Sequence, residues 1–191
     1  MSPVLVMREP REISPPRPMP DCWFSMTRDF ASVEQQVRKK TFGILSTIDK
    51  SGRPHSTGIL YGVSSPDTHF ALYILAGANY VKVRNIRRDP RVSLVVTFPR
   101  YYLRFVPASY VMFRGTAEIL PFDDHDGRAA FQGSRILRMN LNMDVDSKNL
   151  VFIRIRPEPH VVCYGLGIGL MEFRNHPENA GYSVTIPASR L

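Results

Sequence analysis

The sequence has little cysteine, no long apolar run and no metal-binding motif. Its two cysteines, Cys22 and Cys163, are too few for a disulfide scaffold or a multi-cysteine zinc site, and they fit a reducing compartment. The longest apolar run, Phe70 to Ala76, is far shorter than the ~20 residues that cross a bilayer. The five histidines form no i,i+4 pair and no glutamate-flanked zinc motif, so we expect neither a metal site nor a membrane span.

The sequence also lacks the features of an exported or a disordered chain. It has no charged start followed by an apolar segment, so we expect no signal peptide and a cytoplasmic location. A hydrophobic content of 43% among 191 residues excludes a disordered chain and is enough for one domain with a buried core. No serine lies in a Gly-x-Ser-x-Gly motif, which excludes a nucleophile of that kind.

Proline is concentrated at the N-terminal end. Six prolines fall among the first twenty residues, where they fix the backbone and remove hydrogen-bond donors. We therefore expect a proline-rich arm over residues 1–26, one folded domain over 27–170 and a C-terminal tail over 171–191, where we find no clear period. The charges of the arm cancel, so the net charge of +8 lies in the folded part.

Between these ends, short apolar runs are separated by turn residues such as Asp49-Lys50-Ser51-Gly52. We expect strands over 42–48, 53–63, 69–76, 91–98, 110–120, 150–156 and 159–164, and helices over 29–40, 79–88 and 122–141. Residues 101–107 are either a loop or an extra strand. Since most strands follow one another directly, the sequence predicts a mainly β fold. We expect an antiparallel barrel or sandwich of six or seven strands with flanking helices, and not a doubly wound sheet.

Glycine interrupts the second expected strand. Gly58 and Gly62 share a face with Ser56 and Leu60, which leaves the backbone bare on that face. A glycine inside a strand marks either a bulge at a barrel corner or the close approach of a flat ligand. The pattern alone leaves both interpretations open.

The helix expected over 79–88 carries the strongest chemical signal. A tight Ala-Gly-Ala connection precedes it, and the free N–H groups and dipole of a helix start attract anions. Lys82, in the first turn, is placed to neutralise a phosphate. The alternatives are a solvated basic face or a surface for nucleic-acid phosphates, because four arginines lie close by: Arg84, Arg87, Arg88 and Arg91.

Three blocks of sequence carry a resemblance to a known family. They are Phe42-Gly43-Ile44-Leu45-Ser46-Thr47, Asp49-Lys50-Ser51-Gly52-Arg53-Pro54-His55 and Lys82-Val83-Arg84-Asn85-Ile86-Arg87-Arg88-Asp89-Pro90-Arg91-Val92-Ser93-Leu94. Through these blocks the chain resembles the pyridoxamine 5′-phosphate oxidase-like family of flavin-binding split β-barrels. The Arg-x-His substrate signature of the true oxidases is absent after Tyr164, so we expect a different substrate.

The resemblance implies a homodimer that binds FMN, or the deazaflavin coenzyme F-420, in two clefts between the subunits. It implies that residues 56–61 lie along the isoalloxazine ring, that Lys82 binds the phosphate, and that the strand from Tyr110 and the strand near Tyr164 come from the partner subunit. Tyr110 stands where many FMN oxidases have glutamine, and Tyr80 and Val81 stand where another arginine is usual. The expected cofactor-binding residues are Ser56, Thr57, Gly58, Ile59, Tyr80, Val81, Lys82, Tyr110 and Tyr164.

We therefore expect a flavin-dependent oxidoreductase that transfers hydride to or from a small organic substrate. The cofactor supplies the chemistry in such a protein, so no catalytic residue is assigned. The alternatives are a deazaflavin-dependent reductase, a non-catalytic flavin- or haem-binding protein, and a basic nucleic-acid binder.

Overall fold

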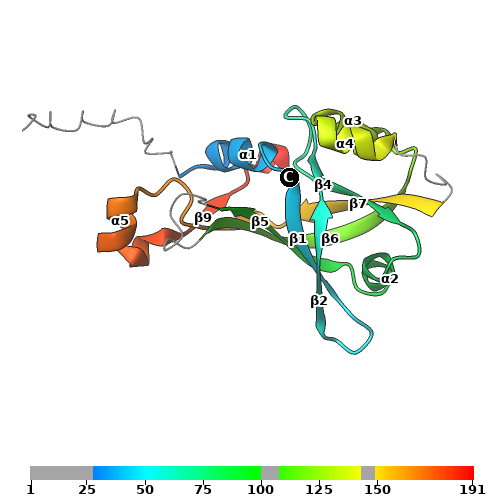
Figure 1. Cartoon of the computed structure of the whole chain (residues 1–191), viewed down its shortest axis with the longest axis horizontal. Helices are drawn as coiled ribbons and strands as arrows, with labels where there is room; N and C mark the ends of the chain where they lie inside the picture. The colour runs from blue at the N-terminus through cyan, green and yellow to red at the C-terminus, as the bar shows by residue number, and fades with distance from the viewer. Residues whose placement is uncertain (1–27, 100–107, 143–148) are drawn as a thin grey trace, which may run out of the picture.

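The computed structural model describes residues 28–99, 108–142 and 149–191, which form a curled antiparallel sheet with flanking helices (Figure 1). The expected arm over 1–26 and the segment 101–107 lie outside these residues. The described strands are β1 (Phe42–Ile48), β2 (Pro54–Leu60), β3 (Gly62–Val63), β4 (Leu72–Gly77), β5 (Arg91–Phe98), β6 (Ser109–Pro121), β7 (Leu150–Pro157), β8 (His160–Tyr164) and β9 (Gly181–Thr185). The described helices are α1 (Phe30–Arg38), α2 (Val81–Arg88), α3 (His125–Gln132), α4 (Arg135–Leu141) and α5 (Leu170–Asn175), with short 3-10 turns η2 (Pro177–Ala180) and η3 (Ala188–Arg190).

One continuous stretch of chain forms both end strands of the sheet, β2 and β3, and so brings the two ends of the sheet together. The strand order is β2-β1-β5-β6-β7-β4-β3, and only Tyr61 separates β2 from β3. The Tyr61 side chain is fully buried, and its hydroxyl donates to the Val37 carbonyl of α1 at 2.7 Å. Burial raises the pKa of Tyr61 above its usual value, so the phenol stays protonated. This antiparallel split barrel confirms the fold class expected from the sequence.

Alternating side chains from the strands fill the barrel. Leu45, Leu94 and Phe113 are successive partners across β1, β5 and β6, and all three are fully buried. The expected bounds of β1 and β5 agree with the structure, because an apolar strand pattern ends there at a turn or at a proline. In the turn after β1, Gly52 has a φ of 76°, which a side chain would strain.

Helix α1 covers one end of the barrel. The Asp29 carboxylate caps the helix by accepting the Ser32 backbone N–H at 2.8 Å. Farther along the helix, Glu34 is only 8% exposed and forms ion pairs with Arg38 of the same helix and with Arg190. A carboxylate so deeply buried needs such partners, and here they tie α1 to the C-terminal end of the chain.

The single helix expected over 122–141 is two helices, α3 and α4, which pack on the outside of β3 and β4 (Figure 1). The break falls at Gly133 and Ser134, where glycine weakens the helix and serine stands at the N-cap position of the next one. Phe131 packs edge-on against Phe152 of β7, with ring centres 5.4 Å apart. The helix pair thus gives this outer part of the sheet a second apolar core.

Residues 171–191, which the sequence analysis set apart as a tail, belong to the same sheet. Strand β9 pairs with β8 over its whole length, and Val184 and Ile186 are buried in the barrel core. Tyr182, Val184 and Ile186 alternate with small or polar residues, so a short strand pattern was present in the sequence. Its five residues were too few to stand out beside the irregular segment that precedes them.

Candidate functional site

The barrel is open between β2 and the far end of β4. Strand β3 pairs with β4 only at Leu72 and Tyr73, whereas β4 continues to Gly77 and then leads into α2. Strand β2 is the last strand at its end of the sheet, so one of its edges has no ladder partner among the described strands. Backbone N–H and C=O groups on that edge remain available to a ligand.

Helix α2 packs against β1 and β6. The buried Asn85 side chain donates to the Thr47 hydroxyl at 3.0 Å, and Arg88 donates to the Ile48 carbonyl at the same distance. Lys82 precedes Asn85 by three residues and so lies on the same side of the helix. Thr57 lies on the same inner face of the β1–β2 pair as Thr47, and its β1 partner is the core residue Leu45.

Thr57 has a buried hydroxyl without a hydrogen-bond partner among the described residues. Its neighbour on the same face of β2, Ile59, is 5% exposed, so water has little access here. An unpaired buried hydroxyl costs about 1–3 kcal/mol, and native proteins keep few of them. The Thr57 hydroxyl is therefore a position that a polar ligand would satisfy.

Lys82 is half-buried at the start of α2, and among the described residues no carboxylate forms an ion pair with it. Its Nζ lies 5.3 Å from the centre of the Tyr80 ring. Burial lowers the pKa of the Lys82 ammonium below its usual value of 10.5, because the charged form loses water without gaining an anion. Tyr80 occupies the N-cap position and makes no side-chain cap hydrogen bond. The helix start therefore presents a cation and first-turn N–H groups that lack a side-chain acceptor from the cap.

Gly58 and Ser56 point to the opposite, outer face of β2. The pairing of β1 with β2 is regular through Gly58, so the bulge interpretation of this glycine is wrong. The Phe42 ring lies over it instead: a Cβ added to Gly58 would come within 3.0 Å of two atoms of that ring. The Ser56 hydroxyl hydrogen-bonds to the Ser46 hydroxyl at 2.8 Å. The bare backbone at Gly58 thus accommodates an aromatic side chain of the same sheet.

Tyr110 and Tyr164 stack on each other on neighbouring strands. They are direct partners in β6 and β8, their ring centres are 5.4 Å apart, and the ring planes differ by 16°. Two strands, β1 and β5, separate β6 from β2 in the sheet. Thr57 and Ile59 thus lie on the inner face of β2, and Lys82 lies in the first turn of α2. The two tyrosines lie on other strands, while Tyr80 and Val81 expose 58% and 44% of their surfaces at the helix start.

An apolar row crosses the outer face of the sheet and was not identified from the sequence. Ile44, Val95, Met112 and Val162 are successive partners across β1, β5, β6 and β8. Ile44 is 39% exposed, and the neighbouring Phe42 is 52% exposed. We call these five residues the outer apolar row. The sequence signal for this row was the run 42–48, which has apolar residues on both alternating faces of the strand.

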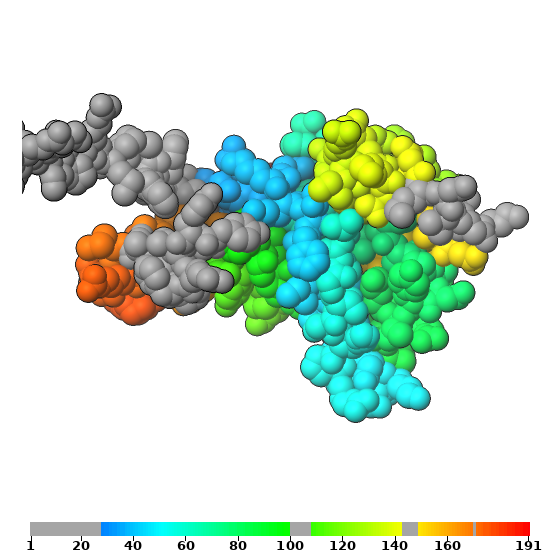
Figure 2. Space-filling view, in the orientation of Figure 1, coloured from blue at the N-terminus to red at the C-terminus, as the bar shows by residue number. Residues whose placement is uncertain are grey.

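Figure 2 shows β1 and β2, in blue and cyan, at the front of the molecule, with their hairpin projecting beyond the body. The structure has a cavity of about 300 Å³ beside β4 and β7 and an open groove of about 680 Å³ beside the β1–β2 hairpin. None of the nine expected site residues lines either of them.

Within the described ranges, no three His, Cys, Asp or Glu side chains come together to hold a metal ion, and none of the helices is long and apolar enough to cross a membrane.

Comparison with solved structures finds related folds at low sequence identity. A haem-binding protein from Mycobacterium smegmatis is 19% identical, with a TM-score of 0.58; the match covers 76% of this chain and 53% of the other, so this chain spans about half of that protein. A conserved hypothetical protein from Mycobacterium tuberculosis is 22% identical, with a TM-score of 0.52 and coverages of 70% and 83%. The haem storage protein of Vibrio cholerae is 16% identical, with a TM-score of 0.53 and coverages of 69% and 92%.

Comparison with curated protein sequences finds no match. A family model described as pyridoxamine 5′-phosphate oxidase matches residues 31–159, which is well over half of the chain and includes both the β1–β2 pair and α2. The match spans the blocks that carried the resemblance in the sequence. The chain therefore belongs to the pyridoxamine 5′-phosphate oxidase-like family.

Proposed function

We propose that this protein is a flavin-dependent oxidoreductase that binds FMN between the β1–β2 pair and the start of α2. The observation that carries the proposal is the half-buried Lys82 ammonium, which has no carboxylate partner among the described residues and lies at a helix start without a side-chain cap. A phosphate monoester would give the ammonium its counter-ion and accept hydrogen bonds from the first-turn N–H groups.

Other groups around this helix start fit the rest of a flavin nucleotide. The Thr57 hydroxyl, buried and unpaired, would donate to a phosphate or ribityl oxygen. The free edge of β2 offers backbone donors and acceptors of the kind that the polar rim of a flavin ring requires. A bound flavin supplies hydride transfer at its N5 atom, and the protein holds the ring and shields it from water. The substrate is a small organic molecule, and the missing Arg-x-His signature supports a substrate other than pyridoxamine phosphate.

We propose that the active form is a homodimer assembled through the outer apolar row. A two-fold contact brings the same face of both subunits together, so exposed Phe42 and Ile44 would be covered by their own copies or neighbours. Tyr110 and Tyr164 lie on this same face, next to Met112 and Val162 along their strands. Dimerisation would therefore bring the tyrosine pair of one subunit toward β2 of the other, which a single chain does not do.

The test is a titration of the purified protein, freed of any bound chromophore, with FMN followed by flavin fluorescence. We expect saturable quenching with one FMN per chain, and at least a tenfold weaker affinity in Lys82→Ala, because a charge-assisted contact to phosphate is lost. Lys39→Ala removes an exposed lysine at the C-terminal end of α1 and serves as the matched control. Equal FMN affinity in Lys82→Ala and Lys39→Ala would refute the assignment of the phosphate to Lys82.

A parallel titration with the deazaflavin F-420 separates the two flavin cofactors. Haem is the second candidate ligand, favoured by the two related structures that are named for haem binding and haem storage. Titration with haemin, followed at the Soret band, tests it directly, and saturation by haemin without any response to FMN would replace the flavin proposal.

The basic face of α2 supports a nucleic-acid function less well than its sequence suggested. Arg88 donates to the Ile48 carbonyl and to the Asn85 side chain, so its guanidinium is directed at the protein. Arg91 pairs with Asp89 at 2.7 Å, and this pair lowers the pKa of Asp89 to about 2, so the carboxylate stays charged. Two of the arginines that would contact phosphates therefore already have partners.

A further inference from the structure

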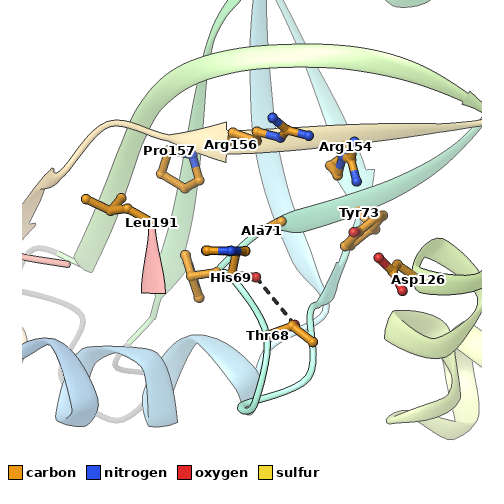
Figure 3. Close-up of a pocket in the computed structure, with 10 residues that line it drawn as sticks. Thr68, His69, Ala71, Tyr73, Asp126, Arg154, Arg156, Pro157 and Leu191 are labelled. Carbon is orange, nitrogen blue, oxygen red and sulfur yellow. Dashed lines mark hydrogen bonds between the residues drawn. The ribbon is translucent and has the colours of Figure 1, made fainter. Parts of the chain in front are cut away.

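The cavity beside β4 and β7 is lined by residues outside the proposed flavin site. It has a volume of about 300 Å³, which is at the lower end of the range for small-molecule sites. Figure 3 shows Arg154 and Arg156 of β7 on one side, Tyr73 of β4 and Asp126 of α3 on another, and His69 facing them from the loop before β4. None of these residues takes part in the proposed flavin site.

Two guanidinium groups in this cavity share one carboxylate. Arg154 donates through Nε to one oxygen of Glu118, and the Arg156 Nε forms an ion pair with the same oxygen at 3.1 Å. Arg154 also hydrogen-bonds to the Tyr73 hydroxyl. These contacts lower the pKa of Glu118, chiefly through its hydrogen bond with Arg154, so it carries one negative charge against two positive charges. Among the described residues, several of the ten N–H donors of the two guanidinium groups have no acceptor and are available to an anion.

The partial burial of the Arg154 guanidinium and of the Tyr73 hydroxyl strengthens their interaction with a bound anion. The Arg154 side chain is 21% exposed, whereas the Arg156 side chain, at 64%, reaches into solvent at the rim. The Tyr73 residue is 2% exposed, and burial raises the pKa of its hydroxyl, so the group stays a hydrogen-bond donor at neutral pH. A bidentate contact from a partly desolvated guanidinium is among the stronger ways in which proteins bind carboxylate and phosphate.

The remaining wall is apolar and held in place. Phe70, Ala71 and Pro157 are buried in it, and Leu191 covers one side. The segment that carries Leu191 is fixed to the loop before β4, since Arg190 donates to the Thr68 carbonyl at 2.8 Å and accepts the Phe70 N–H at 2.6 Å through its own carbonyl. The cavity thus combines a cationic end with a rigid apolar wall.

We propose that this cavity binds a small organic anion, in which a carboxylate or phosphate group meets Arg154 and Arg156 and an apolar body lies against Phe70 and Pro157. Asp126 does not reverse this preference, because its side chain is 58% exposed and is hydrogen-bonded to His125. The proposal does not depend on the flavin function, since it concerns different residues on another part of the barrel.

The test is a titration of the full-length protein with probes of one shape and different charge. Benzoate and phenyl phosphate carry the proposed anionic groups, benzyl alcohol is neutral, and benzamidine is a cation. Binding is followed by the amide shifts of residues 69–73 and 154–157 in NMR spectra. We expect benzoate or phenyl phosphate to bind at least about tenfold more tightly than benzyl alcohol and benzamidine. Inorganic phosphate, which has no apolar body, should bind more weakly than phenyl phosphate.

Two variants make the result specific. Arg156→Gln removes the more exposed guanidinium while Arg154 keeps its contacts with Glu118 and Tyr73, and it should weaken the anion at least about fivefold. Arg138→Gln, an exposed arginine on α4, is the matched control and should leave the affinity unchanged. Lys82→Ala should also leave it unchanged, which separates this site from the flavin site. Equal binding of benzoate and benzyl alcohol, or equal affinity in Arg156→Gln and Arg138→Gln, would overturn the proposal.

Discussion

Two parts of the same sheet present apolar side chains outward, and the described chain covers only one of them. Under α3 and α4, Phe152 is fully buried and Phe131 is 1% exposed. On the outer apolar row, Phe42 and Ile44 expose 52% and 39% of their surfaces. The strand pattern is equally apolar in both places, so the difference arises from where the helices fall along the chain. One region is completed by its own chain, whereas the other is available to a second subunit.

The same difference appears in polar groups. Arg154, Glu118 and Glu34 all have partners of opposite charge within the described chain. The Thr57 hydroxyl lacks a hydrogen-bond partner among the described residues, and Lys82 lacks a carboxylate there. Buried groups that remain unpaired cost stability, and in proteins they occur where a ligand or a partner supplies what is missing. The comparison therefore distinguishes groups whose partners lie within the described chain from the groups to which we assign binding in the proposal above.

The largest expected effect concerns the covered region. Phe131→Ala should lower the free energy of unfolding by about 3–5 kcal/mol, because it opens a cavity between α3 and Phe152. Urea denaturation followed by circular dichroism measures this value. A loss below about 1 kcal/mol would mean that the helix pair contributes little to the fold.

The next effect concerns the uncovered region. Ile44→Asp should dissociate the dimer, because it places a charge in the centre of the proposed contact, and the affinity for FMN should fall at least about tenfold. Light scattering after size-exclusion chromatography measures the mass. Ile136→Asp changes an apolar residue on α4 that is 55% exposed and should leave the dimer intact. A dimer that survives Ile44→Asp would exclude the outer apolar row as its interface.

A smaller effect on stability, opposite in sign, is expected for two threonines on the paired strands β1 and β2. Thr57→Val removes an unpaired hydroxyl and should stabilise the ligand-free protein by about 1 kcal/mol while weakening the binding of FMN. Thr47→Val removes the acceptor of the buried Asn85 amide and should destabilise the protein by about 1–3 kcal/mol. Thermal and urea unfolding of both variants, with and without FMN, measure the changes. A destabilised Thr57→Val protein without ligand would show that its hydroxyl has a partner.

The smallest effect is a pH dependence of cofactor affinity. The free protein holds the pKa of Lys82 below 10.5, and a bound phosphate would favour the protonated form. As the pH rises through that lowered pKa, the ammonium loses its proton and the affinity for FMN should fall several-fold, whereas binding should be strongest below it. Titrations between about pH 7.5 and 10.5 measure the profile, since the phosphate is already a dianion there. In Lys82→Ala the profile should be flat over the same range.

The regular parts of the fold could be predicted because their signals are local. Strands β1 and β5 lie where alternation and turns placed them, and a helix that contains Lys82 lies where the sequence predicted one. The pairing of β9 with β8 depends instead on strands that are distant in the sequence. The same holds for the sharing of Glu118 by Arg154 and Arg156, because strand register is a property of the folded sheet.

The same limit, between local signals and contacts that join distant strands, applies to the residues expected at the site. The sequence indicated residues near one another in the chain, such as Tyr80, Val81 and Lys82, and the family resemblance added Tyr110 and Tyr164. It gave no sign that the Phe42 ring lies over Gly58 or that Tyr110 stacks on Tyr164, since each contact joins separate strands. Nor did it show that Thr57 lacks a hydrogen-bond partner, because satisfaction of a buried group depends on the whole three-dimensional neighbourhood.

Tyr61 is the single residue that connects the two end strands of the sheet, β2 and β3. The backbone passes from β2 to β3 at this residue, and the Tyr61 hydroxyl donates a hydrogen bond to the Val37 carbonyl of α1. A separation of β2 from β4 would therefore either move α1 with Tyr61 or break the hydrogen bond between Tyr61 and Val37. Amide exchange at Tyr61, whose N–H is donated to the Thr41 carbonyl, would report on such an opening.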